Sequence, residues 1–306
     1  MTTTLPFGLV PADLPWMSPQ EGERLDVTVG RRGPLTGGGN TAVISVLSLD
    51  GQRRSVFVKR TADRLRREAN RHRALAGRVP LPKLLGVVER DEAEVMVLEH
   101  LPRTGPDAAS MTPGSSAEVD SVLELSASLA RVTDVDQSVF PHQPGMDQTV
   151  FEGMVARTLG ALTEEGFAVD PAAWLLAYRT AGTALAGFPR ALSHGEFALQ
   201  HIGRTSQGEL VMVDLETCFP RARFTDPATL LREVSGLVGE AERSLFERWC
   251  AAAEVGGEAD DHWREFLTTR IVVAVETLPW LVSEPTLASR LPGVVEQVSH
   301  DLSGLR

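Results

Sequence analysis

The sequence contains 306 residues, of which 42% are hydrophobic, and its formal net charge at pH 7 is −11. This length suits one two-lobed unit or two domains with a sizeable core. The acidic balance argues against a general nucleic-acid binder, because phosphate backbones require a basic surface. No run of about 18 uncharged apolar residues is present, so we expect no membrane span. The N-terminal residues also lack the basic and apolar regions of a secretory signal.

Two cysteines are present, Cys218 and Cys250. Their spacing does not match a metal site, so we expect free thiols in a reducing cytoplasm. The acidic surface would suit a cationic small molecule, although such a charge balance is common in soluble proteins. The sequence leaves the oligomeric state open.

The first third of the chain is rich in strand signals. Residues 1–24 are expected to form an N-terminal arm with one short helix at about 18–24. Five strands are predicted from β-branched or alternating runs, with Asp50-Gly51 typical of a hairpin turn: 25–29, 41–49, 55–59, 84–88 and 94–98. A helix is expected over 62–76, because Ala69, His72 and Leu75 share one face at helical spacing. Its other face is rich in arginine.

The remainder of the chain is predominantly helical. Residues 102–116 are rich in Pro, Gly, Ser and Thr and are expected to form a linker. Strand-like residues return only at 209–214. A β-rich third before a helical remainder predicts an α+β fold in two lobes. Three parts are predicted. Residues 1–24 are expected to form an N-terminal arm, and residues 25–101 a small antiparallel lobe with one helix. Residues 102–306 are expected to form a larger helical lobe that holds the catalytic loop and the acceptor-binding helices.

A run of three glycines, Gly37-Gly38-Gly39, precedes Asn40 between the first two predicted strands. Glycines allow backbone N–H groups to approach phosphate oxygens without a Cβ in the way. The same residues would also suit a plain hairpin tip. The run alone therefore does not separate a phosphate loop from a flexible turn.

Lys59 ends an apolar strand, where its ammonium could reach the phosphates of a nucleotide. A lysine there could equally blunt a sheet edge. Glu68, nine residues further on in the predicted helix, could pair with Lys59 and hold it in place. Alternatively, Glu68 is an ordinary surface charge among its arginine neighbours, Arg66, Arg67 and Arg71.

The apolar strand 94–98 runs into Glu99-His100-Leu101. A crossover between two lobes would offer the backbone N–H and C=O groups of these three residues to the flat base of a nucleotide. The alternative is a strand that simply runs into a loop.

The stretch Leu192–Glu216 carries polar side chains at defined spacings: Glu196, His201 five residues on, and Asp214 thirteen further. Kinase-type phosphotransfer sites place a base and two metal ligands at about this spacing. Asp214 follows an apolar strand, where a carboxylate suits either Mg²⁺ or a turn. Glu196 could orient a hydroxyl and accept its proton, or be a plain loop carboxylate. His201 could be a ligand or a structural histidine, and His194 is expected to brace the loop.

These features follow the order that a bilobal kinase requires, and the sequence resembles the aminoglycoside phosphotransferase family, which has a protein-kinase-like fold. The resemblance covers roughly residues 25–235. It is carried by three segments: 65–86, which resembles the family's αC helix and the next strand; Val95–Pro102, which resembles its hinge; and His194-Gly195-Glu196 with Val211–Glu216 and Asp226-Pro227, which resemble its catalytic and metal loops. The C-terminal helices match only in being helical.

The resemblance implies a nucleotide site and a metal site. Lys59, paired with Glu68, would contact the α/β-phosphates, and Glu99 to Leu101 would face the purine. Asp214 and His201 would hold Mg²⁺. His201 stands where the family commonly has Asn and where members that phosphorylate macrolides are similar in having His.

The resemblance also assigns the catalytic and supporting groups. Glu196 would act as the base, with His194 and Glu216 supporting the residues that contact the reactants. Glu196 stands where the family has Asp, and a displacement of about 1 Å can cost around a hundredfold in rate. Leu230 stands where the family has a second Asp, four residues after Asp226, which implies the loss of a structural contact.

Two functions are therefore expected as alternatives. The first is an ATP- or GTP-dependent, Mg²⁺-assisted O-phosphotransferase acting on a hydroxyl of a small molecule, such as an antibiotic or another natural product. The second is a kinase-like protein that binds a nucleotide or a peptide partner without efficient transfer, which Glu196 favours. An unrelated α+β domain with a chance set of motifs is a third interpretation.

Overall fold

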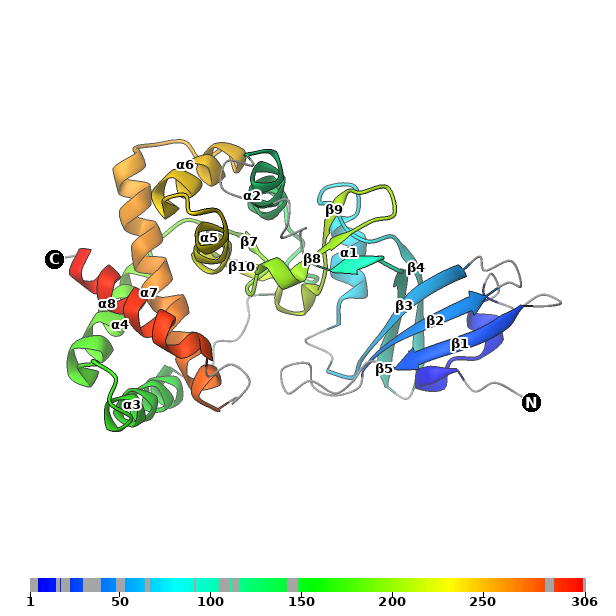
Figure 1. Cartoon of the computed structure of the whole chain (residues 1–306), viewed down its shortest axis with the longest axis horizontal. Helices are drawn as coiled ribbons and strands as arrows, with labels where there is room; N and C mark the ends of the chain where they lie inside the picture. Colours follow the sequence, from blue (N-terminus) through cyan, green and yellow to red (C-terminus); the bar gives the residue numbers. More distant parts are fainter. Residues whose placement is uncertain are drawn as a thin grey trace. The chain divides into compact units, whose positions relative to one another are not determined.

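The computed structural model describes residues 5–14, 17, 23–29, 40–47, 53–63, 67–90, 92–104, 111, 116–141, 148–283 and 289–304. The chain forms two compact units, which Figure 1 traces in sequence colours. Unit 1 combines Met1–Pro106 with Gln200–Thr217, and unit 2 combines Asp107–Leu199 with Cys218–Arg306. The stretch expected to form one catalytic loop, residues 192–216, is therefore divided between the two units.

Unit 1 is built on a five-stranded antiparallel sheet with the order β1-β2-β3-β5-β4 (Figure 1). All five predicted strands are confirmed, and their bounds are β1 (Arg24–Val29), β2 (Thr41–Leu47), β3 (Arg53–Thr61), β4 (Leu84–Arg90) and β5 (Ala93–Glu99). The expected Asp50-Gly51 turn lies outside the described residues, but β2 and β3 pair in the antiparallel register of a hairpin.

Both faces of this sheet are covered by apolar side chains. Successive strand residues point to opposite faces, so Val95 and Val97 of β5 pack in one cluster while Met96 and Leu98 pack in the other. The first cluster is covered by the N-terminal arm and the second by Ala69 of α1. Burial on both sides explains why β5 reads as an unbroken apolar run after Glu94.

The described part of the N-terminal arm contains two short 3-10 helices, η1 (Pro6–Gly8) and η2 (Pro11–Asp13). Four of its apolar residues pack onto the sheet: Leu5, Leu9, Leu14 and Met17. The expectation of a helix reaching Arg24 is wrong, because Arg24 begins β1 and pairs with Leu47. Residues 18–22 of that expected helix lie outside the described residues.

The helix α1 (Ala69–Leu75) is shorter than the expected helix over 62–76. The strand β3 continues to Thr61, and Glu68 has a position just before the helix, not within it. The predicted inner face is confirmed where it is described, since Ala69, His72 and Leu75 are all buried. The chain leaves the helix at Ala76, whose backbone is extended.

A second, small sheet also belongs to unit 1. It has the order β6-β8-β9, with β6 (Arg103–Thr104), β8 (Ile202–Arg204) and β9 (Leu210–Met212). The strand expected at 209–214 is thus confirmed in part. The backbone N–H of Met212 donates to the carbonyl of Pro80 at 2.9 Å, which ties the end of β9 to the segment between α1 and β4.

In its described residues, unit 2 is built of helices and one pair of short strands. Its helices are α2 (Ser116–Ala130), α3 (Gln148–Glu164), α4 (Pro171–Leu185), α5 (Thr225–Val238), α6 (Glu242–Ala252), α7 (Ala259–Ser283) and α8 (Leu291–Gly304). The strands β7 (Arg190–Ser193) and β10 (Phe219–Ala222) pair antiparallel and were not predicted, because runs of four residues carry too little periodicity.

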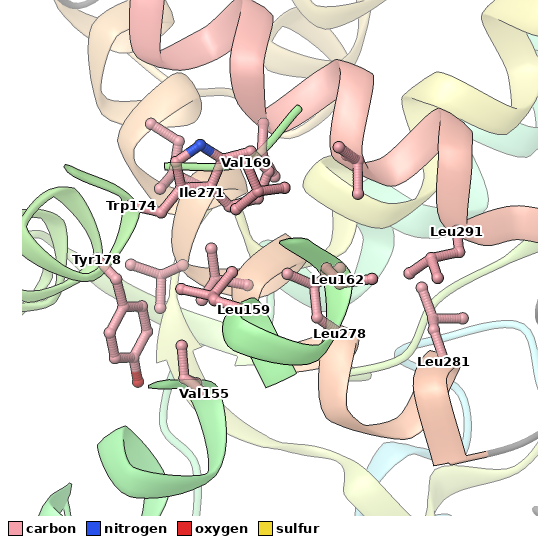
Figure 2. Packing of buried hydrophobic residues seen from close by; sticks show 14 of the residues in the cluster. Val155, Leu159, Leu162, Val169, Trp174, Tyr178, Ile271, Leu278, Leu281 and Leu291 are labelled. Atoms are coloured by element: carbon pink, nitrogen blue, oxygen red, sulfur yellow. The ribbon is translucent and has the colours of Figure 1, made fainter. Parts of the chain in front are cut away.

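One apolar cluster of this unit joins α3, α4, α7 and α8. Figure 2 shows Leu159, Leu162 and Leu278 converging in it, with Trp174 lying beside Val169 and Ile271. By length and composition α7 could also cross a membrane, but half of its apolar window is buried. Burial of this kind is found in core helices that pass the same test.

Candidate functional site

Lys59 lies at the centre of a cluster of carboxylates in unit 1. Its ammonium makes an ion pair with Glu68 and lies 2.6 Å from Asp214 Oδ1 and 2.9 Å from Glu216 Oε1. The side chain of Lys59 is only 13% exposed. The pairing of Lys59 with Glu68 that the sequence suggested as one alternative is therefore observed, and the edge-lysine alternative is excluded because β3 lies between β2 and β5.

Three separate elements bring this cluster together. Lys59 points from β3, where it is paired in register with Thr41 and Met96. Glu68 immediately precedes α1, and Asp214 follows β9 by two residues. Asp214 has a left-handed backbone with φ of 69°, a conformation in which Asp is enriched among non-glycine residues.

The electrostatics of the cluster favour a charged lysine. Burial lowers the pKa of Lys59, but the charges of Glu68, Asp214 and Glu216 outweigh burial and raise the pKa well above its usual range. Burial, together with the nearby charges of Asp214 and Glu216, raises the pKa of Glu68 to about 7 against the opposing effect of Lys59. Lys59 thus carries a fixed positive charge at neutral pH.

The same carboxylates form a donor set suited to a hard cation. Oxygen atoms of Glu68, Asp214 and Glu216 lie within 4.8 Å of one another. His201 is the last residue of the short 3-10 helix η5 (Leu199–His201). Its Nε2 lies 3.9 Å from Asp214 Oδ2. Carboxylate oxygens are the ligands that Mg²⁺ and Ca²⁺ prefer. These residues therefore fit a divalent cation, and Glu216, expected only in a supporting position, lies among the possible ligands.

The turn before Glu196 belongs to unit 2 and is held by one buried carboxylate. Asp226, at the start of α5, accepts hydrogen bonds from Ser193 Oγ at 2.7 Å, from the His194 N–H at 2.9 Å and from the Gly195 N–H at 3.0 Å. Gly195 has a φ of 88°, which only glycine adopts easily. The carboxylate of Glu196 follows this fixed turn and is exposed.

His194 is buried and contributes to the packing of this turn. Its ring meets the ring of Phe197 edge to face at 5.5 Å between centroids. Its backbone N–H is bound by Asp226. That His194 braces the loop stays a prediction.

The residues of the expected hinge lie at the end of β5 in unit 1. Glu99 pairs with Lys83 through its backbone N–H at 3.0 Å, and its carboxylate accepts from the Lys83 N–H at 2.8 Å. His100 is exposed, and partial burial together with the charge of Arg53 lowers its pKa. A Cβ at Gly203 would meet Leu101, so β8 runs close to the side chain of Leu101.

The expected phosphate loop is described only at its last residue. Gly37, Gly38 and Gly39 lie outside the described residues. Asn40 is half-buried, and its carbonyl accepts from the Arg60 N–H at 2.7 Å, which places it at the start of β2 beside the strand that carries Lys59.

Sequence reasoning missed two buried charged residues next to this cluster. Arg71 was expected on the arginine-rich outer face of the helix, yet it is 3% exposed and donates to backbone carbonyls of the turn after Asp214. Glu94 was treated as a plain strand residue, yet its carboxylate accepts from the N–H groups of Glu68 and Ala69. No local pattern identifies either residue, because their partners are distant in the sequence.

A family model described as the phosphotransferase enzyme family (APH) matches residues 44–266 of the chain. A sequence search found no match among curated proteins. An ethanolamine kinase of Plasmodium vivax has a similar structure, with 13% identity over 90% of this chain and 81% of that one and a TM-score of 0.57.

Two further structures of similar fold were solved with ligands. A thermostable mutant of the aminoglycoside phosphotransferase APH(4)-Ia, in a ternary complex with ADP and hygromycin B, is 14% identical over 91% of this chain and 93% of that one, with a TM-score of 0.56. The amicoumacin kinase hAmiN, in complex with AMP-PNP, Ca²⁺ and Ami, is 11% identical over 88% and 90%, with a TM-score of 0.51. At these identities the likeness is one of fold, and it confirms the expected α+β architecture.

Proposed function

Because the chain belongs to the phosphotransferase enzyme family, whose model matches more than half of it, we propose that it transfers a phosphoryl group from ATP or GTP to a hydroxyl of a small molecule. The observation that carries this proposal is the cluster of three carboxylates around the partly buried Lys59. Phosphoryl transfer is catalysed mainly by positioning and electrostatic stabilisation, which such a cluster can provide.

Each residue of the cluster has a role in this proposal. Lys59 would hold the α/β-phosphates, and Glu68 would fix the direction of its ammonium. Asp214 and His201 would hold Mg²⁺, and Glu216 lies close enough to Asp214 to join them. When bound, Mg²⁺ would neutralise charge on the β- and γ-phosphates. The Ca²⁺ complex of the amicoumacin kinase supports a hard divalent cation in this fold.

Residues outside the cluster would bind the remaining parts of the substrates. The backbone of Glu99, His100 and Leu101 would face the purine, and the loop ending at Asn40 would cover the phosphates. Glu196 would orient the acceptor hydroxyl and take its proton, for which it must lie within hydrogen-bond reach of that hydroxyl. The ADP and hygromycin B complex of a structure with this fold supports a nucleotide together with a small hydroxylated acceptor. We propose a cytoplasmic protein.

Glu196 also favours a second candidate function, a nucleotide-binding protein without efficient transfer. A glutamate is one methylene longer than the aspartate of the family pattern, and a misplaced base of about 1 Å can lower the rate roughly a hundredfold. Nucleotide binding would survive this change, because the nucleotide and the cation would be held by Lys59 and Asp214, which lie in unit 1.

Thermal stabilisation by nucleotide tests both functions together. We expect Mg-ATP or Mg-GTP to raise the Tm of the wild type, because a ligand that binds only the folded state stabilises it. Asp214→Ala should lose most of this shift relative to its own nucleotide-free Tm. Asp261→Ala is the matched control, since Asp261 is an exposed carboxylate on α7. No shift with either nucleotide would exclude both functions.

Variants of Glu196 separate transfer from binding alone. The nucleotide-induced Tm shift should be retained in Glu196→Ala and Glu196→Asp. If the chain is an enzyme, Glu196→Ala abolishes acceptor-dependent release of ADP or GDP, while Glu196→Asp retains or increases it. Nucleotide binding without turnover in the wild type and in Glu196→Asp, across a panel of hydroxylated amines, sugars and macrolides, would favour the binding function.

A further inference from the structure

Arg71 is a buried charged residue in the first turn of α1. Its side chain is 3% exposed, although arginine is rarely buried unless it is paired. Its Nη1 donates to the carbonyl of Leu215 at 3.1 Å and to the carbonyl of Glu216 at 2.7 Å. Both carbonyls belong to the turn that carries Asp214 and Glu216. Arg71 therefore binds the backbone of the proposed metal-binding turn.

Glu68 holds the same turn through a different backbone group. Its Oε2 accepts from the Leu215 N–H at 2.8 Å, while its other oxygen faces Lys59. Glu68 immediately precedes α1 and Arg71 lies in its first turn, three residues further on. One N–H and two carbonyls of residues 215 and 216 are thus bound by two side chains from the N-terminal end of α1.

These contacts explain how Asp214 keeps its backbone conformation. A non-glycine residue in the left-handed region costs about 1 kcal/mol relative to the right-handed region, and Asp214 has a φ of 69°. The peptide groups that follow it are fixed by Glu68 and Arg71. If they were released, rotation at Asp214 would carry its carboxylate away from Lys59 and Glu216.

The start of α1 is itself anchored to the sheet. Glu68 N–H and Ala69 N–H both donate to Glu94 Oε1, at 2.9 and 3.0 Å, so a strand residue caps the helix in place of a local side chain. Arg67 adds a contact to Glu89 at 3.2 Å on β4. Arg71 therefore reaches the turn from an element whose position is fixed.

We propose that Arg71 is a positioning residue that holds the turn Asp214–Glu216 in the geometry required to bind a divalent cation together with a nucleotide. The proposal rests on the proposed function for the identity of the ligands. It assigns Arg71 no contact with the nucleotide or the cation. Its loss should therefore weaken the response to the cation more than the response to a metal-free nucleotide.

The test compares Arg71→Met and Arg71→Lys with Arg73→Met in the full chain. Arg73 is an exposed arginine on the same helix whose side chain contacts Asn70, which makes it the matched control. For each variant, the Mg²⁺ concentration that gives half of the ATP-induced Tm shift is measured, alongside the shift with ATP in EDTA. We expect about a tenfold higher Mg²⁺ requirement in Arg71→Met, which corresponds to the loss of about one hydrogen-bonded contact.

Hydrogen exchange of the nucleotide-free protein gives a readout independent of ligands. Peptides covering 212–217 should exchange faster in Arg71→Met than in the wild type, while peptides of β2 and β3 stay protected. Arg71→Lys retains one charged donor group. Its Mg²⁺ requirement and its exchange rate should therefore lie between those of Arg71→Met and those of the wild type. It also carries the test if Arg71→Met does not fold. Arg73→Met should match the wild type throughout.

The outcomes separate this proposal from the proposed function. A wild type that Mg-ATP and Mg-GTP fail to stabilise overturns the function, while the hydrogen-exchange comparison still decides whether Arg71 holds the turn. A wild type that is stabilised, with both Arg71 variants showing an unchanged Mg²⁺ requirement and unchanged exchange at 212–217, overturns the positioning role. A lower Tm with the same Mg²⁺ requirement assigns Arg71 to stability alone and likewise overturns it.

Discussion

At the scale of single residues, two turns that carry candidate site residues, one in each unit, use the same device. A buried carboxylate accepts backbone N–H groups of a turn and thereby fixes the functional residue next to it. Glu68 does so for the turn after Asp214, and Asp226 does so for the turn before Glu196. Ionised acceptors make stronger hydrogen bonds than neutral ones, so one carboxylate can fix several donors.

Asp226→Asn tests this device in unit 2. Asp226 accepts its three hydrogen bonds with two oxygen atoms, whereas asparagine has only one side-chain oxygen. The NH₂ group of the asparagine would face an N–H group. We expect a loss of about 2 kcal/mol in the free energy of unfolding, since hydrogen bonds to a charged group are being weakened. Turnover should fall further than stability explains, with the Tm shift by Mg-nucleotide retained. Urea unfolding and nucleotide titration measure the two effects.

An exposed carboxylate provides the control for Asp226. Asp136 also accepts from a backbone N–H and a hydroxyl, both of Ser138, but it lies at the surface. Asp136→Asn should leave turnover unchanged. Equal turnover in wild type and Asp226→Asn would show that Glu196 does not depend on this carboxylate.

At the scale of elements, prediction from sequence succeeded where periodicity is long and failed where it is short. The five strands and the long helices of unit 2 were predicted because each carries at least two repeats of its pattern. The pair β7 and β10 was missed, as was β6, because each has four residues or fewer. The start of the expected helix at 62–76 was wrong, because α1 begins only at Ala69, where Glu94 supplies the helix cap from 25 residues away.

Within unit 2, a buried ion pair joins α7 to the C-terminal helix α8. Arg270 and Asp301 are 3% and 0% exposed, and Arg270 Nε donates to Asp301 Oδ2 at 2.7 Å. Arg270→Met leaves the carboxylate buried with Gln297 as a remaining donor. Removing one partner of a buried pair is strongly destabilising, so we expect a loss of about 3 kcal/mol.

Chemical unfolding of three variants checks this expectation. Arg264→Met, which removes an exposed arginine paired with Asp261 on the same helix, should cost less than about 1 kcal/mol. The double variant Arg270→Met with Asp301→Leu should recover much of the loss, because the fully buried charge of Asp301 is removed together with its partner, while Glu242 loses its ion pair with Arg270 in both variants. Similar losses for Arg264→Met and Arg270→Met would contradict a special role for the buried pair.

At the scale of the whole molecule, the site could be predicted as a set of residues but not as a set of contacts. The order of Lys59, Glu68, Glu196, His201 and Asp214 along the chain suggested the proposed type of chemistry. Their distribution over two units, with residues 200–217 in unit 1, depends on pairing between β6 and β8 and on the bond from Met212 to Pro80. Contacts between residues more than 100 positions apart leave no periodic signal.

This discontinuity makes a prediction about fragments. The fragment 1–106 contains Lys59, Glu68 and Arg71 but not the turn whose backbone groups bind the last two. Each buried polar group left without its partner costs about 1–3 kcal/mol. We therefore expect this fragment to be less stable to urea than the same fragment joined by a Gly/Ser linker of about 20 residues to residues 200–217. Such a linker behaves as a flexible coil and imposes little geometry of its own.

The control for the fragments removes the contacts and keeps the chain length. In the fused fragment, Glu68→Gln together with Arg71→Met deletes the side chains that bind residues 215 and 216. The double variant is made both in the fragment 1–106 and in the fused fragment. The fused fragment should then be hardly more stable than the fragment 1–106 when both carry the two substitutions. If residues 200–217 stabilise the variant as much as the parent fragment, packing of β8 and β9 accounts for the gain, and the polar contacts around the turn do not.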